Sequence, residues 1–95
     1  MSEMPLSVPP SSFEELKLMM AHHKIRLPRQ LYRIMIEAIQ GPDLIAFGTA
    51  HDVAATCGVS PSTVSRLARH LGFKSFKELK ALFREPFQEV TFRTA

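Results

Sequence analysis

The sequence predicts an all-α domain, a compact bundle of five to six helices that contains a helix-turn-helix. Apolar residues recur at helical spacing in several segments, capping residues or prolines precede most of these segments, and no segment alternates long enough to form a strand. The chain has 95 residues, of which 45% are hydrophobic and 22% charged, so one domain with a modest core is expected. No apolar run approaches the roughly 20 residues of a membrane span.

The chain is expected to divide into one domain with short ends. Residues 1–10 contain three prolines and no apolar periodicity, so we expect a flexible arm there. Residues 11–87 hold the helical signals and form the expected domain, whereas residues 88–95 show none and are expected to be a linker or tail. Within the domain, helices are expected to begin at Phe13, Pro28, Asp43, Ala50, Pro61 and Phe76.

The ends of these helices carry recognisable signals. The first helix should run to about His23, and Gly72 should end the fifth as its C′ residue. The last helix should reach Pro86 or Phe87, because a proline ends or bends a helix. Side chains that cap a helix start are expected at Ser11 and Ser12 (with Glu14 and Glu15), Thr49 (with Asp52), Ser60 (before Pro61) and Ser75 (with Glu78).

Residues 50–71 are the most informative segment, because their spacing is typical of a helix-turn-helix. Ala54 is small where two helices must cross closely, and Gly58 lies where the chain turns and a positive φ is expected. Val64 faces back from the second helix to fill the gap between them. A helix held in this way has the right shape to enter a DNA major groove. We therefore expect a DNA-binding module, and not an enzyme.

The outward face of the second motif helix supplies the expected contacts to bases. At 100° per residue, Ser62, Arg66 and Arg69 point away from the apolar face, and Thr63 and Ser65 lie on its flanks. Arg66 is the first choice for reading a base, because its guanidinium can pair with both acceptors of guanine. Pro61 is either an apolar contact or simply a helix starter. The residues expected to meet base edges are Pro61, Ser62, Thr63, Ser65 and Arg66.

Contacts to phosphate are expected from cationic side chains and from two helix N-termini. Residues 60–84 carry six basic side chains against Glu78 alone, a net charge of +5, within a chain whose total is +3. Such a patch attracts a polyanion, although many charge runs are only solvated faces. The N-termini near Thr49 and Ser75 add free N–H groups. The residues expected to meet phosphate are Thr49, His51, Arg69, His70, Lys74, Ser75 and Lys77.

No cofactor or metal is expected from this sequence. The single cysteine, Cys57, excludes an intramolecular disulfide and suits a reducing cytoplasm. The histidines and Cys57 do not have the spacing of metal ligands. The sequence contains neither a serine in a nucleophile elbow nor a glycine-rich phosphate loop. The alternative to DNA binding is a helical protein-interaction domain that has a helix-turn-helix shape without binding DNA.

From Leu27 to Lys80 the chain resembles the N-terminal domain of RpiR-type transcriptional regulators. The run after the second motif helix is fairly specific to that family. The matching residues are Pro42, Phe47, Asp52-Val53-Ala54, Gly58-Val59-Ser60, Thr63-Val64, Arg66 and Leu71-Gly72-Phe73-Lys74-x-Phe76-x-Glu78-Leu79-Lys80.

The resemblance implies a bacterial, cytoplasmic regulator of genes for sugar or sugar-phosphate metabolism. It implies a homodimer bound to double-stranded DNA at a partly palindromic operator. It also implies a phosphosugar effector, sensed by a C-terminal sugar-isomerase-like domain that is absent from these 95 residues. An apolar surface at Leu18 or Met19 of the first helix would favour pairing with a second copy.

Overall fold

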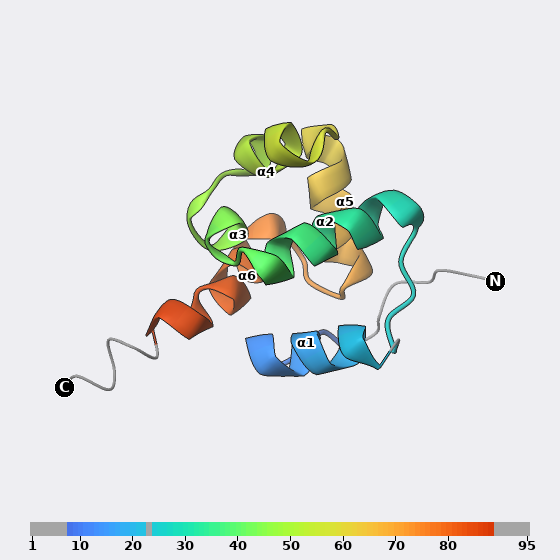
Figure 1. Ribbon diagram of the computed structural model, residues 1–95, viewed down its shortest axis with the longest axis vertical. Helices are drawn as coiled ribbons and strands as arrows, with labels where there is room; N and C mark the ends of the chain where they lie inside the picture. The colour runs from blue at the N-terminus through green and yellow to red at the C-terminus, as the bar shows by residue number, and fades with distance from the viewer. Residues whose placement is uncertain (1–7, 23, 89–95) are drawn as a thin grey trace.

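The computed structural model describes residues 8–22 and 24–88, and this part of the chain is all-α, as predicted (Figure 1). It contains no strand and has a further turn of helix at residues 85–88. The six named helices are α1 (Phe13–Ala21), α2 (Arg29–Gln40), α3 (Asp43–Phe47), α4 (Ala50–Cys57), α5 (Pro61–His70) and α6 (Phe76–Phe83).

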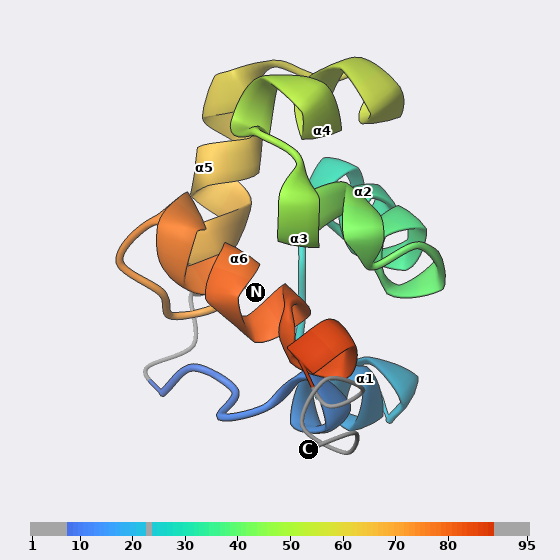
Figure 2. The same ribbon diagram turned by 90° about the vertical axis from the view of Figure 1, so that its left-hand side faces the viewer.

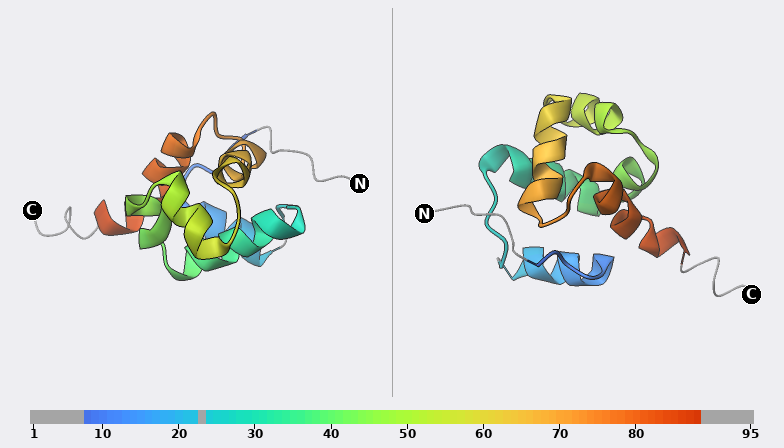
Figure 3. Two further views of the ribbon diagram at one scale, coloured as in Figure 1. Left: turned by 90° about the horizontal axis from the view of Figure 1, so that it is seen from above. Right: turned by 180° about the vertical axis from the view of Figure 1, so that it is seen from behind.

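Helices α2 to α6 form the body of the domain, and α1 covers the end opposite α4 (Figures 1 and 2). α4 packs against α5, and α3 packs against α6. α2 and α5 contact each other through their inner faces and lie on opposite sides of the body, so their outer faces point in opposite directions (Figures 2 and 3). All six helices contribute buried apolar residues to one core. The largest fully buried side chains are Phe83, Leu16, Leu31, Ile34, Met35, Ile45, Leu67, Leu71 and Leu79.

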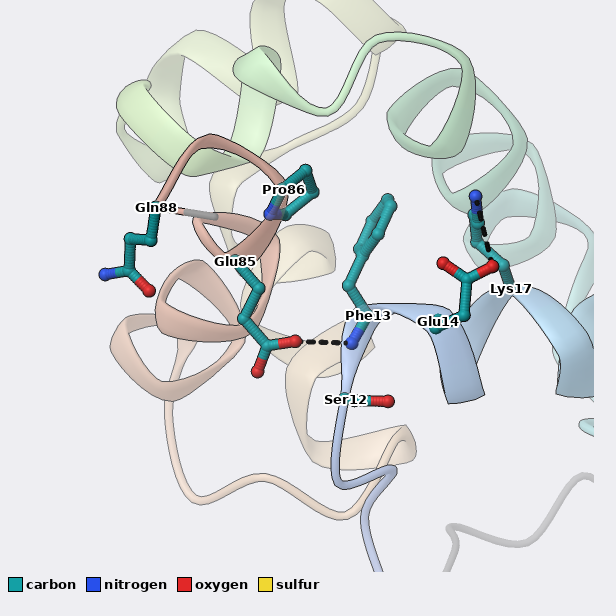
Figure 4. Close-up of a pocket in the computed structure, with 7 residues that line it drawn as sticks. All are labelled: Ser12, Phe13, Glu14, Lys17, Glu85, Pro86 and Gln88. Carbon is teal, nitrogen blue, oxygen red and sulfur yellow. Dashed lines mark hydrogen bonds and ion pairs between the residues drawn. The ribbon is translucent and has the colours of Figure 1, made fainter. Parts of the chain in front are cut away.

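The first residues of α1 are fastened to the C-terminal end of the domain. The rings of Phe13 and Phe83 meet edge to face with centroids 5.0 Å apart. The Glu85 carboxylate accepts a hydrogen bond of 2.8 Å from the Phe13 N–H, beside a pocket of about 520 Å³ (Figure 4). Pro10 is buried, so the packed body includes it; residues 1–7 of the expected arm lie outside the described residues.

Three of the predicted caps are confirmed. Thr49 and Asp52 form a complete capping box, in which the Asp52 carboxylate accepts from the Thr49 N–H at 2.9 Å and the Thr49 hydroxyl accepts from the Asp52 N–H at 3.1 Å. The Ser60 hydroxyl accepts from the N–H of residue 63 at 3.3 Å. The Ser12 hydroxyl accepts from the Glu15 N–H at 3.0 Å. Local spacing was sufficient to identify these three helix starts.

The capping boxes predicted for Ser75 and Ser11 are wrong. Ser75 has the extended backbone of an N-cap but makes no capping bond with its side chain, and the Glu78 carboxylate accepts from the Lys74 N–H at 2.9 Å and not from the Ser75 N–H. The Ser11 N–H and hydroxyl both donate to the Glu15 carboxylate at 2.6 Å, four residues away rather than three.

Several helix ends also differ from the prediction. α1 ends at Ala21, and α2 begins after Pro28, which occupies the N-cap position instead of the first turn. α6 stops at Phe83, and the bond from the Arg84 N–H to the Lys80 carbonyl at 3.0 Å is its last. Pro86 cannot extend the helix, because it has no N–H to donate to the Leu82 carbonyl. The chain then makes the separate turn at 85–88, so residue 88 is helical, and residues 89–95 lie outside the described part. None of the described helices has the length and apolar character needed to cross a membrane.

Candidate nucleic-acid interface

The turn between α4 and α5 has the geometry that the sequence predicted. Gly58 ends α4 with φ of 71° and ψ of 36°, a left-handed conformation that favours glycine. The Val59 N–H donates to the Ala54 carbonyl at 2.9 Å and closes the turn. Ala54 is 3% exposed and Val64 is fully buried. Both residues therefore lie in the core at the crossing of the two helices, as predicted. These contacts fix the direction of α5.

α5 divides into a buried face and a solvent face. Thr63, Val64, Leu67 and Ala68 are buried, and they point toward the core. The solvent face is continuous along the helix, and nothing in the described chain covers it. Its exposed residues are Pro61, Ser62, Ser65, Arg66 and Arg69. The predicted surface at residues 62, 66 and 69 is therefore open to solvent in the monomer.

Thr63 does not lie where the sequence analysis placed it. Only 7% of Thr63 is exposed, and its hydroxyl lies 3.0 Å from the Ser60 hydroxyl. The reason is geometric: Thr63 precedes Val64 in the arc of α5 that packs on the core, and the N-cap serine satisfies the hydroxyl there. Thr63 therefore takes part in the hydrogen bonding of the first turn, and little of it is open to a ligand.

Four cations form an exposed group on α5 and at the start of α6. Arg66, Arg69, Lys74 and Lys77 are all exposed, and none of them pairs with a carboxylate among the described residues. His70 is half-buried beside them. No carboxylate neutralises these cations locally, so their positive potential favours a polyanionic partner.

The other two cations of the +5 segment serve the fold. The Lys80 ammonium donates to the Gly48 carbonyl at 2.7 Å, and the Arg84 Nε donates to the Ala46 carbonyl at 2.9 Å. These carbonyls lie at the C-terminal end of α3, where helix backbone lacks internal partners. The sequence analysis did not predict this role. Lys80 and Arg84 are four positions apart and therefore lie on one face of the helix, which indicates that both side chains could reach the same neighbouring segment.

Carboxylates already occupy parts of the two helix N-termini that were expected to hold phosphate. The capping box at α4 uses the N–H groups of Thr49 and Asp52, and the hydrogen bond from the Thr49 N–H holds the pKa of the Asp52 carboxyl below its ordinary value. At α6 the Glu78 carboxylate occupies the Lys74 N–H. An anion at either place would meet a negative neighbour, so the cationic side chains are the stronger phosphate candidates.

A helical bundle of this kind, with an exposed cationic face on the second helix of a helix-turn-helix, defines the class of DNA-binding regulator domains. Residues 32–89, more than half of the chain, match the family model for the helix-turn-helix domain of the RpiR family. The chain belongs to this family, as its resemblance suggested. Comparisons with curated proteins and with solved structures returned no match. Regulator domains of this class are typically not enzymes.

The matched region begins in α2 and contains the whole helix-turn-helix, whereas α1 lies before it. Within the described residues, no group of three His, Cys, Asp or Glu side chains is placed to hold a metal ion. The site of interest is therefore the surface of α5 and its neighbouring helix starts.

Proposed function

We propose that this domain binds double-stranded DNA sequence-specifically, with α5 in the major groove. Family membership implies a DNA-binding transcriptional regulator. The main support for sequence-specific binding is the open solvent face of α5, where Ser62 and Arg66 lie exposed near the helix N-terminus. In helix-turn-helix proteins this part of the second helix meets the base edges.

The proposed base contacts are those of the predicted set that remain exposed. Arg66 is assigned bidentate pairing with a guanine, since it is exposed and has no carboxylate partner to compete. Ser62 and Ser65 can donate or accept a hydrogen bond at the neighbouring bases, and Pro61 can supply an apolar contact. Thr63 is assigned no base contact, because only 7% of the residue is exposed and its hydroxyl lies 3.0 Å from the Ser60 hydroxyl.

Phosphate contacts are assigned first to cationic side chains. Arg69 continues the solvent face of α5, and Lys74 and Lys77 flank the start of α6. Neutral and helix-terminal groups complete the proposed set. At Thr49 and Ser75 the role is weaker, because the Asp52 and Glu78 carboxylates lie at these helix starts. These residues are Thr49, His51, His70 and Ser75.

The biological setting is proposed from the family. The domain would act as a homodimer on a partly palindromic operator, in the cytoplasm of a bacterium, and control genes of sugar or sugar-phosphate metabolism. A phosphosugar effector would act through a C-terminal domain outside these 95 residues. Two copies on adjacent half-sites would each insert α5 into one major groove, about one helical turn apart.

Fluorescence anisotropy with a random-sequence duplex at two salt concentrations tests DNA binding itself. We expect binding at low salt that weakens steeply as salt rises, because Lys and Arg release counterions from the phosphates. Lack of binding at low salt, or indifference to salt, would favour the alternative of a protein-interaction domain.

Selection of bound duplexes from a random pool then tests sequence specificity. We expect one enriched half-site, and an inverted repeat of it where two copies bind together. A pool that remains random after selection would leave only non-specific DNA binding.

A further inference from the structure

A groove between α2 and α4 lies outside the proposed DNA-binding surface. It has a volume of about 290 Å³. α2 and α5 lie on opposite sides of the body (Figures 2 and 3), so the α2 wall of the groove faces away from the solvent face of α5. The other wall, Thr56 and Cys57, ends four residues before α5 begins at Pro61. Its lining residues are Tyr32, Arg33, Ile36, Glu37, Thr56 and Cys57.

The outer face of α2 carries apolar and charged side chains in matched pairs. Tyr32 and Ile36 are large hydrophobic residues that remain 39% and 36% exposed, four positions apart. Arg33 and Glu37 are also exposed and four positions apart, and neither makes an ion pair with another described residue. A basic and an acidic side chain thus stand one turn apart beside an apolar strip.

We propose that a second copy of this chain docks in this groove, with the two α2 helices antiparallel about a two-fold axis. A rotation of 180° between residues 34 and 35 brings Arg33 next to the partner's Glu37, and Tyr32 next to the partner's Ile36. The same two contacts then occur twice, which is the defining property of an isologous interface. The surface is complementary to itself in charge as well as in apolar character.

This self-complementarity selects a second copy over other occupants. DNA is disfavoured because Glu37 places a negative charge within the groove. An unrelated protein would have to match the order of charge and apolar groups that the chain already supplies. Six residues line the groove, far fewer than the roughly 20–30 residues per partner of a stable complex, so the dimer is weak and dissociates on dilution.

The contact goes beyond DNA binding and leaves α5 uncovered. In the antiparallel pair the two α5 helices face away from each other, so this interface differs from the contact between copies on adjacent half-sites. Self-association is measured without DNA, so its outcome is independent of the outcome of the DNA-binding experiments.

Sedimentation equilibrium of the whole chain, up to about 1 mM, tests the proposal with charge reversals. Arg33→Glu and Glu37→Arg should each weaken self-association about tenfold or more, because each puts like charges in both contacts. An equimolar mixture of these two variants should recover association, because each contact then joins unlike charges. Lys24→Glu and Asp43→Arg, at exposed residues outside the groove, are matched controls and should leave association unchanged.

The mixed pair joins an acidic face to a basic face, which attract each other in either orientation. The doubly reversed chain, Arg33→Glu with Glu37→Arg, is therefore the decisive variant: it restores unlike charges in both antiparallel 33–37 contacts and should associate like the wild type. A wild-type chain that stays monomeric at the highest concentration would overturn the proposal. So would single variants that associate like the wild type, or a mixture or doubly reversed chain that does not recover. Because both residues are exposed, folding of each variant is verified by its circular dichroism and its unfolding transition.

Cys57 provides a second readout, because it is the only cysteine and lines the groove. Its reaction with a maleimide should slow as the protein concentration rises into the range where the dimer forms. If sedimentation detects a dimer while the labelling rate stays constant, the copies pair through another surface and the proposal fails.

Discussion

The Thr63 hydroxyl lies 3.0 Å from the Ser60 hydroxyl, within the first turn of α5 and largely out of solvent. The Ser60 hydroxyl also accepts from the Thr63 N–H at 3.3 Å. These two residues therefore hold the N-terminal turn of α5 in place, while Pro61, Ser62 and Ser65 remain on its exposed side. The division separates residues that set the direction of the helix from residues that can touch a ligand.

Removing the cap should lower stability, whereas removing the Thr63 hydroxyl should not affect DNA binding. Ser60→Ala leaves the N-terminal turn without its side-chain acceptor, and we expect a loss of about 1 kcal/mol in the free energy of unfolding. Thr63→Val keeps the shape and loses one hydroxyl pair, at a cost of about 1 kcal/mol or less. Urea unfolding measures both. A large loss of DNA affinity in Thr63→Val, with stability intact, would contradict the structural role given to Thr63.

Arg66 should determine base preference. On a duplex selected from a random pool, Arg66→Ala should cost about 1–3 kcal/mol of binding free energy and relax the preference at one base pair. Arg66→Lys keeps the charge but loses the planar fork, so it should retain non-specific affinity and lose discrimination. Anisotropy titrations with the selected and a scrambled duplex measure the difference.

Lys17→Ala, on α1 and far from α5, is the matched control for loss of one positive charge. It should change neither affinity nor preference. Equal discrimination by wild type and Arg66→Ala would mean that another residue reads the base.

Lys77 should contribute to affinity without contributing to sequence preference. Lys77→Ala should weaken binding to all duplexes alike, because Lys77 is exposed at the start of α6 and is assigned to phosphate. The slope of the logarithm of affinity against the logarithm of salt concentration should fall in magnitude by about 0.9, the value for one phosphate contact. An unchanged slope would remove Lys77 from the interface.

Gly58 is required because of its backbone conformation, and not because a side chain at this position would lack space. A Cβ at this position would have no atom within 4 Å, but φ is +71°. Gly58→Ala should therefore destabilise the domain by about 1–2 kcal/mol, the cost of a left-handed conformation for an ordinary residue. Gly58→Asn should cost less, because asparagine tolerates this conformation better. Thermal unfolding compares the two, and equal losses would point to a steric cause.

The capping box of α4 should make stability depend on pH. The Thr49 N–H holds the pKa of Asp52 below its ordinary value, so the charged form stabilises the folded state at neutral pH. This contribution is lost as the pH falls through the lowered pKa. The melting temperature of the wild type should exceed that of Asp52→Asn at about pH 7, and the two should converge near about pH 2. A difference that persists in acid would assign the effect to packing.

Much of this protein follows from local spacing along the chain. Capping residues lie within a few positions of the helix starts that they define, as at Thr49 and Ser60, so the sequence identifies those starts directly. The positive φ at Gly58 and the buried stripe through Val64 also depend on neighbours in sequence. For the same reason, the family match and the helix-turn-helix were both recognisable before any coordinates.

Contacts between distant segments could be known only once the chain had folded. Lys80 and Arg84 carry the same charge as Lys77, but their carbonyl partners come from the end of α3, more than thirty positions earlier. Thr63 lies at the border of the buried arc, where the packing of α5 on the core decides exposure. Periodicity gives the direction of a side chain about its own helix, and only the neighbouring helices decide whether that direction meets protein or water.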